Sequence, residues 1–359
     1  MLVAFNKKAG EAFLERVKGK KPLFACVIGV TETAKTPGIS AAGENPDLTD
    51  YTPPADVELL LLGKCRCIPG VPVTPEGIPT PALITKAALG LADIPVLVVS
   101  GGLRVKPQIP FVELGGSPGG DIKTGKAVDN AEEVFEKAKI LGENLAKNAE
   151  YLVIGESVPG GTTTALGVMM AMGVNAEGKV SSSMPNNPHE LKIKTVKAGF
   201  KASNIKFGDL KDKPFKAVSH VGDPMMPAFA GMVVGAAGDT PVLMAGGTQM
   251  GAILAILKAL KPEILDNVAV GTTRWIIADR TADLAGIVAQ IADVPVLAAN
   301  LDFGQSKFDG LKAYEAGVVK EGVGAGGACI AAILKSSGKI SKADLLAEVE
   351  KIYSQLVSS

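Results

Sequence analysis

The chain has 359 residues, of which 47% are hydrophobic, 21% charged and only 4% aromatic. Lysine plus arginine equal aspartate plus glutamate at 37 each, so no net charge attracts a nucleic acid or an anionic membrane. The scarcity of aromatic side chains also argues against a surface that stacks single-stranded bases. This length allows one large α/β domain, or two moderate ones, with a full hydrophobic core.

Neither a membrane span nor a secretion signal is expected. The mean hydropathy is +0.27 and residues 240–257 carry no charge, but Gly246 and Gly247 divide that stretch into a short strand and a helix. A spanning helix needs about 20 predominantly apolar residues. Residues 1–21 are too charged for a signal peptide, so we expect a cytoplasmic protein.

The cysteines are expected to be reduced thiols, because their spacing resembles no disulfide framework in a chain of this length. They are Cys26, Cys65, Cys67 and Cys329. Only two histidines, His189 and His220, accompany them. This supply of ligands does not suggest a metal site.

Short apolar runs followed by turn residues recur along the chain, and many are continuous, which is typical of strands buried on both faces. We expect strands at residues 23–30, 57–62, 94–99, 151–154, 217–221, 242–245, 268–270 and 294–298. Apolar spacings of three and four predict helices at residues 130–147, 162–172, 251–260, 281–291 and 325–334. The alternation predicts an α/β fold, a three-layer, doubly wound, mostly parallel sheet that binds ligands at the edge carrying the strand-to-helix loops.

The two ends of the chain differ from this pattern. Residues 9–17 and 341–356 are predicted to be helical, the latter opening with a capping pair, Ser341 and Asp344. We expect residues 1–21 and 336–359 to pack together as a small helical subdomain beside an α/β domain of residues 22–335. The apolar stripe of the last helix is equally suited to a dimer interface and to core packing.

Two long segments rich in polar residues and glycine, 31–55 and 106–128, interrupt the pattern. Long loops in compact domains are usually functional or disordered, and the first is a candidate substrate lid because it follows an early strand. Within the second, residues 120–127 resemble a Walker A loop. Ala127 stands where a magnesium-binding hydroxyl is needed, so ATP or GTP binding is weakly supported.

The clearest candidate for a binding loop begins at Gly155 and Glu156, directly after the strand at 151–154. Glycines let the backbone approach a phosphate, and the N-terminus of the following helix presents free N–H groups. The loop residues expected to bind the nucleotide or its phosphate are Gly155, Glu156, Gly160, Gly161, Thr162 and Thr163. An ordinary strand–turn–helix connection with threonine caps is the alternative.

A second glycine run, Glu321 to Gly327, also opens an apolar helix. A partly desolvated carboxylate at Glu321 would suit a general base, although a solvated residue before a glycine turn fits the pattern equally well. Gly322 and Gly324 are expected beside the nucleotide. Other strand ends add Gly246 and Gly247 to the nucleotide site, and the candidate substrate-pocket residues are Ser100, Gly101, His220 and Asp223.

Together these motifs carry a family resemblance. The segment Gly155–Thr163 resembles the phosphate loop of the nicotinate-nucleotide–dimethylbenzimidazole phosphoribosyltransferases, and the segment from Glu321 to Ala325 resembles that family's C-terminal motif. The resemblance runs over roughly residues 90–335 and is closest to an archaeal branch that shares the loop at 36–43. It departs from the bacterial pattern at Val158, where that pattern has Gly, and at Gly161, where it has Asn.

The resemblance implies an enzyme of cobamide biosynthesis. Nicotinate mononucleotide would give its phosphoribosyl group to a benzimidazole-type base, with Glu321 as the catalytic base. It implies no cofactor or metal, a homodimer, and the nucleotide and an aromatic base as the only substrates. The alternative is a catalytically idle protein of the same fold that binds a nucleotide or a cobamide precursor.

Overall fold

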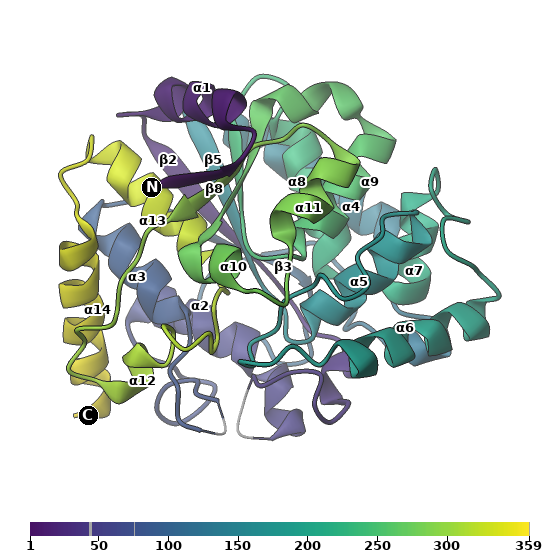
Figure 1. Cartoon of the computed structure of the whole chain (residues 1–359), viewed down its shortest axis with the longest axis horizontal. Helices are drawn as coiled ribbons and strands as arrows, with labels where there is room; N and C mark the ends of the chain where they lie inside the picture. Colours follow the sequence, from purple (N-terminus) through teal and green to yellow (C-terminus); the bar gives the residue numbers. More distant parts are fainter. Residues whose placement is uncertain (43–44, 75, 359) are drawn as a thin grey trace.

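The computed structural model describes residues 1–42, 45–74 and 76–358. Within them an eight-stranded sheet has the order β1-β8-β7-β6-β5-β2-β3-β4, and only the β1–β8 pair is antiparallel (Figure 1). The strands are β1 (Leu2–Phe5), β2 (Pro22–Gly29), β3 (Val96–Gly102), β4 (Val112–Glu113), β5 (Tyr151–Ser157), β6 (Val242–Ala245), β7 (Val268–Thr273) and β8 (Val296–Ala299). The predicted mostly parallel α/β fold is confirmed.

The central strands β2 and β5 are buried almost throughout, which explains their continuous apolar sequences. After β2 the chain moves outward through β3 and β4, and after β5 it moves in the opposite direction through β6, β7 and β8. The strand order therefore reverses between β2 and β5. In open α/β sheets, ligands bind outside the carboxyl ends of the strands at such a switch point.

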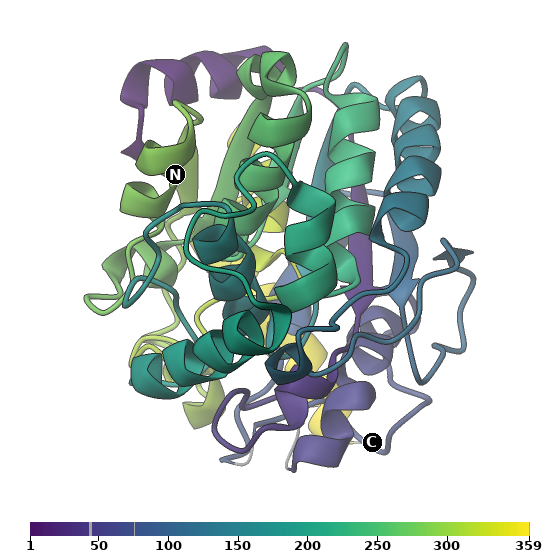
Figure 2. The ribbon, with the colours of Figure 1, turned by 90° about the vertical axis from the view of Figure 1, so that its right-hand side faces the viewer.

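Helices cover both faces of the sheet (Figures 1 and 2). One apolar cluster includes residues of α4 (Ala131–Ala146), α5 (Gly161–Ala171), α6 (His189–Ser203), α7 (Pro214–Val221), α8 (Met225–Ala236), α9 (Met250–Leu260) and α11 (Leu284–Ile291). The other includes residues of α1 (Lys7–Val17), α2 (Thr52–Leu62), α3 (Ala82–Leu91), α13 (Ala325–Lys335) and α14 (Lys342–Val357). Two short helices, α10 (Arg274–Ala278) and α12 (Asp309–Lys312), connect elements after β7 and β8.

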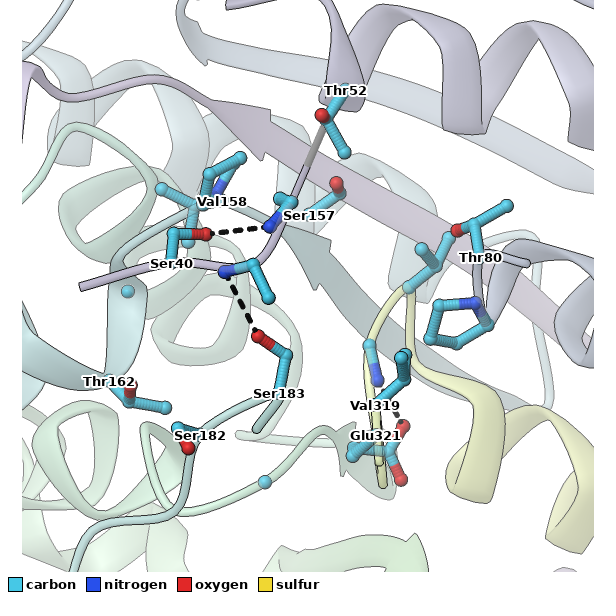
Figure 3. A pocket seen from close by; sticks show the side chains of 18 of the residues that line it. Ser40, Thr52, Thr80, Ser157, Val158, Thr162, Ser182, Ser183, Val319 and Glu321 are labelled. Carbon is cyan, nitrogen blue, oxygen red and sulfur yellow. Dashed lines mark hydrogen bonds between the residues drawn. The ribbon is translucent and has the colours of Figure 1, made fainter. Parts of the chain in front are cut away.

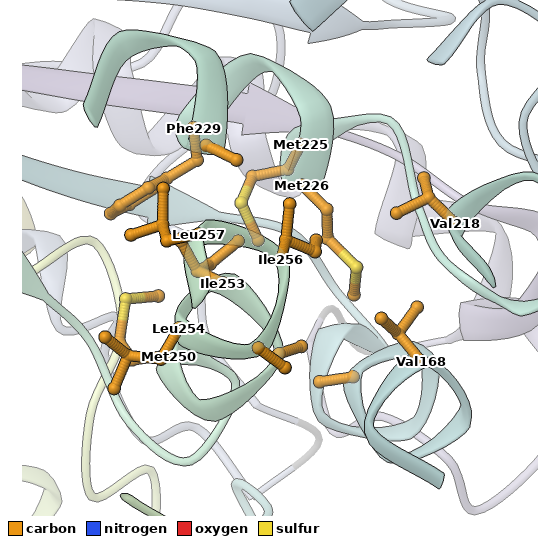
Figure 4. Packing of buried hydrophobic residues seen from close by; sticks show 14 of the residues in the cluster. Val168, Val218, Met225, Met226, Phe229, Met250, Ile253, Leu254, Ile256 and Leu257 are labelled. Atoms are coloured by element: carbon orange, nitrogen blue, oxygen red, sulfur yellow. The ribbon is translucent and has the colours of Figure 1, made fainter. Parts of the chain in front are cut away.

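The first face is packed with flexible and branched aliphatic side chains. Met225, Met226 and Phe229 of α8 lie with Ile253 and Leu257 of α9 in one fully buried cluster (Figure 4). Unbranched methionines fill irregular gaps between branched neighbours. This dense layer gives α5, which starts at the site, a rigid support.

Two predicted strands are wrong. Residues 57–62 belong to α2, and residues 217–221 belong to α7. Both helices have proline in the first turn, where no N–H is needed, and α2 ends at Gly63 with φ 73°. In α2, burial on most sides removed the polar face that distinguishes a helix, so its short apolar run read as a strand.

The chain ends are helical as expected, and the capping box of Ser341 and Asp344 is present. The sequence did not indicate β1, which extends the sheet beside β8. Helix α14 packs chiefly on α3, while α1 packs on β1, and both contribute to the second apolar cluster. A separate terminal subdomain remains a proposal. In the part of the chain that the structure describes, no helix has both the length and the apolarity to cross a membrane.

Candidate functional site

A cavity lies at the carboxyl end of β5, at the switch point of the sheet (Figure 3). The loop after β5 supplies one wall, from Ser157 through Thr162. The turn holding Glu321, Gly322 and Val323 supplies a second. Residues 39–42 of the first long segment also line it, together with residues 72–74, 78, 80 and 81. Motifs far apart in the sequence therefore meet around one space.

The loop after β5 is shaped as an anion-binding helix start. Gly160 precedes α5 with φ 78°, a left-handed conformation that glycine adopts without strain. A Cβ at that position would lie 3.1 Å from the Ala34 Cα, so the backbone also passes too close for a side chain. Thr162, in the first turn of α5, lines the cavity (Figure 3). The N-terminus of α5 thus presents N–H groups and a favourable dipole to the cavity.

Directly behind this loop lies a fully buried lysine. The Lys192 Nζ donates to Thr162 Oγ1 at 2.5 Å and to the Ser181 carbonyl at 2.6 Å. Burial, with a smaller contribution from the Lys320 charge, lowers the pKa of Lys192 to about 7. An ammonium has three donors, so a bound anion would both take up the third N–H and favour the protonated amine. Lys192 therefore places a cation directly behind Thr162, which lines the cavity where α5 begins.

Glu321 lies in a turn held in an unfavourable backbone conformation. The flanking residues Val319 and Val323 have φ of 63° and 54°, and left-handed backbone is disfavoured for β-branched residues by about 1–3 kcal/mol each. The conformation is fixed from both sides, because Val319 N–H donates to the Ser183 carbonyl at 2.8 Å and Thr85 Oγ1 donates to the Val323 carbonyl at 2.9 Å. Strain of this kind concentrates at functional sites.

The Glu321 carboxylate is half-buried and receives backbone donors. Gly322 N–H and Gly326 N–H lie 3.1 and 3.2 Å from Oε1, and Thr272 Oγ1 lies 3.4 Å from Oε2. Burial outweighs these hydrogen bonds and raises the pKa of Glu321 to about 7. A carboxylate with this pKa is a competent general base at neutral pH.

A second carboxylate, Glu156, lies at the end of β5 and lines the same cavity. Gln249 Nε2 donates to Glu156 Oε1 at 2.6 Å. Burial, followed by the charges of Asp223 and Glu321, raises the pKa of Glu156 to about 8. The pKa values of both carboxylates are thus raised above the ordinary glutamate range, that of Glu156 by burial and by two neighbouring negative charges. Of the two, Glu156 is the more suitable hydrogen-bond donor near neutral pH.

The remaining polar wall consists of Asp56, Thr80 and Ser157. Thr80 Oγ1 donates to Asp56 Oδ1 at 2.7 Å, and Ser157 Oγ donates to Asp56 Oδ2 at 2.8 Å. All three line the cavity and are otherwise buried. Burial raises the pKa of Asp56 to about 6.

The structure brings only part of the predicted set to the cavity. The residues that line it are Glu156, Gly160, Gly161, Thr162, Gly247, Glu321 and Gly322. Thr163 is buried beneath the loop, and Gly246 packs against Met250. Gly155 and Gly324 pack against each other, since a Cβ at Gly155 would lie 3.0 Å from Gly324 Cα. Both glycines therefore shape the site from outside the cavity.

The four candidate pocket residues from other strand ends lie away from the cavity. Ser100 and Gly101 sit on β3, where a Cβ at Gly101 would lie 2.3 Å from the Pro224 carbonyl oxygen. His220 lies on α7, and its Nδ1 donates a hydrogen bond to the Gly125 carbonyl at 2.9 Å. Asp223 accepts from Thr164 Oγ1 and from the N–H groups that open α8. His220 and Asp223 do not pair with each other, because each hydrogen-bonds to its own structural partner.

Sequence reasoning missed two polar cavity residues, Asp56 and Thr80, and also Lys192, which lies behind the cavity wall and contacts Thr162. Asp56 lay next to a run assigned to a strand, and Lys192 is one of several lysines on an amphipathic helix with no local distinction. Ser157 directly follows Glu156, and Gln249 lies two residues after Gly247, so their positions in these motifs could have identified both as site residues. Within the described residues, no group of three histidine, cysteine or acidic side chains is arranged to hold a metal.

Comparisons with known proteins agree with this geometry. A profile of the family described as phosphoribosyltransferase matches residues 90–306, more than half of the chain. The matched segment includes the loop after β5 and ends before Glu321. A UPF0284 protein of Methanothermobacter thermautotrophicus is 46% identical over 326 residues, covering 90% of each chain. A UPF0284 protein of Pyrococcus furiosus is 47% identical over 339 residues, covering 94% of this chain and all of the relative.

A similar fold occurs in a solved structure. The crystal structure of the nicotinate-nucleotide–dimethylbenzimidazole phosphoribosyltransferase from Thermus thermophilus superposes with a TM-score of 0.57 at 17% identity, covering 93% of both chains. The fold, the profile match and the archaeal relatives agree with the two motifs that meet at the cavity. The chain belongs to the nicotinate-nucleotide–dimethylbenzimidazole phosphoribosyltransferase family, in the branch that contains the archaeal UPF0284 proteins.

Proposed function

We propose that this protein transfers the phosphoribosyl group of nicotinate mononucleotide to a fused azole base, forming an α-ribotide for the lower ligand of cobamides. One observation carries the proposal. A single cavity joins the N-terminal turn of α5, supported by Lys192, to the poised carboxylate of Glu321. A phosphate-binding helix start and a general base at one cavity suit the transfer of a phosphoribosyl group from a nucleotide to a ring nitrogen.

The chemistry follows from these positions. The α5 turn and Lys192 hold the phosphate, and protonated Glu156 donates to a ribose hydroxyl. The bond between ribose C1 and the pyridinium nitrogen breaks, and its electron pair leaves with nicotinate. A ring nitrogen of the acceptor attacks C1 from the opposite face, and Glu321 takes the N–H proton of the acceptor. General-base assistance of this kind is worth about 10²- to 10⁴-fold in rate.

The segment 31–55 is proposed to act as a lid. Its residues 39–42 already line the cavity, and Ala41 N–H donates to Ser183 Oγ at 3.3 Å across it (Figure 3). Residues 43 and 44 of this segment lie outside the described part of the chain. We also propose that the protein is a cytoplasmic homodimer. Light scattering of the purified protein would measure the mass of the dimer.

The direct test incubates the purified protein with nicotinate mononucleotide and a panel of benzimidazoles and purines. Release of nicotinate together with a new ribotide, both followed by mass spectrometry, is the expected result. Tight nucleotide binding without nicotinate release would instead favour an idle binding protein. The side chain of Val158 gives that alternative a physical basis, because it occupies space beside Gly161, where a Cβ would lie 2.7 Å from Val158 Cγ1.

The pH dependence of kcat/KM for the nucleotide should be bell-shaped with a maximum near pH 7. Glu321 must lose its proton to act as a base, so the rate falls as pH drops below about 7. Lys192 must keep its proton to bind phosphate, so the rate falls as pH rises above about 7. Initial rates across the pH range check this, and a flat profile would contradict both assignments.

A further inference from the structure

The far wall of the cavity has a fixed hydrogen-bond polarity. Thr80 and Ser157 each have one hydroxyl hydrogen, and both hydrogens point to Asp56 at 2.7 and 2.8 Å. Ala82 N–H also donates to Thr80 Oγ1 at 3.2 Å, which uses one of its lone pairs. An ionised carboxylate only accepts. The three side chains therefore offer a ligand hydrogen-bond acceptors and no donor.

This acceptor wall is held rigidly. Asp56 lies in α2, and Ser157 ends β5, the central strand of the sheet. Thr80 is fixed because its N–H donates to the Pro72 carbonyl at 3.0 Å. Burial raises the pKa of Asp56 only to about 6, so its carboxylate is ionised above neutral pH. The pattern of acceptors is thus a permanent property of the cavity at the pH of the cytoplasm.

Most other side chains beside this wall are aliphatic, namely those of Pro72, Val73, Ile78, Pro81 and Val323. Thr52 and Thr74 also line the cavity, and their hydroxyl hydrogens are donated to the Leu48 carbonyl and to Glu76 Oε2. Aliphatic walls with a few fixed polar groups at one end suit a flat ring that has one polar edge. The ring nitrogen that reacts must approach Glu321, which leaves another edge of the ring for the acceptor wall.

Building on the proposed function, we propose that the acceptor base is a fused azole whose six-membered ring carries an amino or hydroxyl donor, and that Asp56, Thr80 and Ser157 recognise this donor. A dimethyl-substituted ring would place methyl groups against these acceptors and leave their remaining lone pairs without a donor. Sites built to hydrogen-bond a substrate group reject analogues that lack it far more strongly than aliphatic pockets reject an extra methyl.

The test compares two nearly isosteric acceptors, 5-aminobenzimidazole and 5-methylbenzimidazole, with adenine and 5,6-dimethylbenzimidazole as further members of each class. At about pH 8, kcat/KM should be at least about 100-fold higher for the amino-bearing bases. Asp56→Asn introduces an amide donor into the wall, so this ratio should fall at least about tenfold, mainly through KM for the amino base. Ser157→Ala, which removes one acceptor, should lower the ratio less.

Nucleotide affinity, measured by calorimetry, checks that each variant is folded, and Thr80→Val replaces Asp56→Asn if that variant does not fold. Equal use of the amino and methyl bases by the unmodified protein would overturn the inference while leaving the proposed function intact. An unchanged ratio in folded Asp56→Asn would also overturn it. Transfer to none of the bases would overturn the proposed function and the inference together.

Discussion

Glu321→Gln is expected to lower kcat by about 10²- to 10⁴-fold, the range for loss of a general base. The amide keeps the shape of the side chain and can still accept from Gly326 N–H, so the strained turn should persist. Nucleotide affinity should therefore change little, because the phosphate contacts lie at the α5 end of the cavity. Nicotinate release under saturating substrates measures kcat, and calorimetry measures binding.

A matched control is Glu315→Gln, which alters a carboxylate outside the cavity that pairs with Arg274. This variant should retain most of its turnover. The acid limb of the pH profile should disappear in Glu321→Gln, because the remaining rate no longer depends on that ionisation. Full turnover by folded Glu321→Gln would show that another group accepts the proton.

Lys192→Met is expected to weaken nicotinate mononucleotide binding by about 10- to 100-fold. A charge-assisted hydrogen bond contributes about 1.5–3 kcal/mol, and methionine removes the charge while filling similar volume. Because the lysine is fully buried, its removal also eliminates a desolvation cost, so the melting temperature should not fall steeply. Calorimetric titration and thermal unfolding measure the two effects.

Lys197→Met provides the control on the same helix. Its side chain is 63% exposed and forms a surface pair with Glu177 at 3.7 Å, so the substitution should leave binding and stability nearly unchanged. A decisive comparison uses nicotinate riboside, which lacks the phosphate. Lys192→Met should bind the riboside as the unmodified protein does. Equal losses for the riboside and the mononucleotide would indicate a general collapse of the cavity.

The central fold was predictable from sequence because buried parallel strands have a simple composition. Tyr151–Ile154 and Val242–Ala245 are continuous apolar runs followed by glycine, and both lie in strands. Helix α2 also contains a continuous apolar run, but it is not a strand. Most of its side chains are buried, so no polar stripe reveals the helical periodicity. Strand β1 was not predicted because it is short and lies at the edge of the sheet. The strand Leu2–Phe5 is recognised from its pairing with β8, which its own sequence does not reveal.

The site was predictable from sequence only where glycine residues mark the local backbone geometry. Gly160 and Gly322 identified two walls of the cavity, and both line it. The acceptor wall depends on Asp56 meeting Ser157, which lies 101 residues away in the chain. Contacts of that separation arise from the fold, and no spacing in the sequence encodes them. Asp223 shows the converse, since its position after a predicted strand suggested chemistry, whereas its carboxylate accepts the N–H groups that start α8.

The contact between Gly155 and Gly324 determines which parts of the site can move. A Cβ on either residue would come within about 3 Å of the other's Cα, so β5 and the start of α13 touch through bare backbone. With no side chain between them to rearrange, the two motifs should shift as one body. Substrate entry is then expected to displace residues 39–42 of the proposed lid. We expect loop exchange during turnover to be confined to that segment, while the reacting groups keep their relative positions.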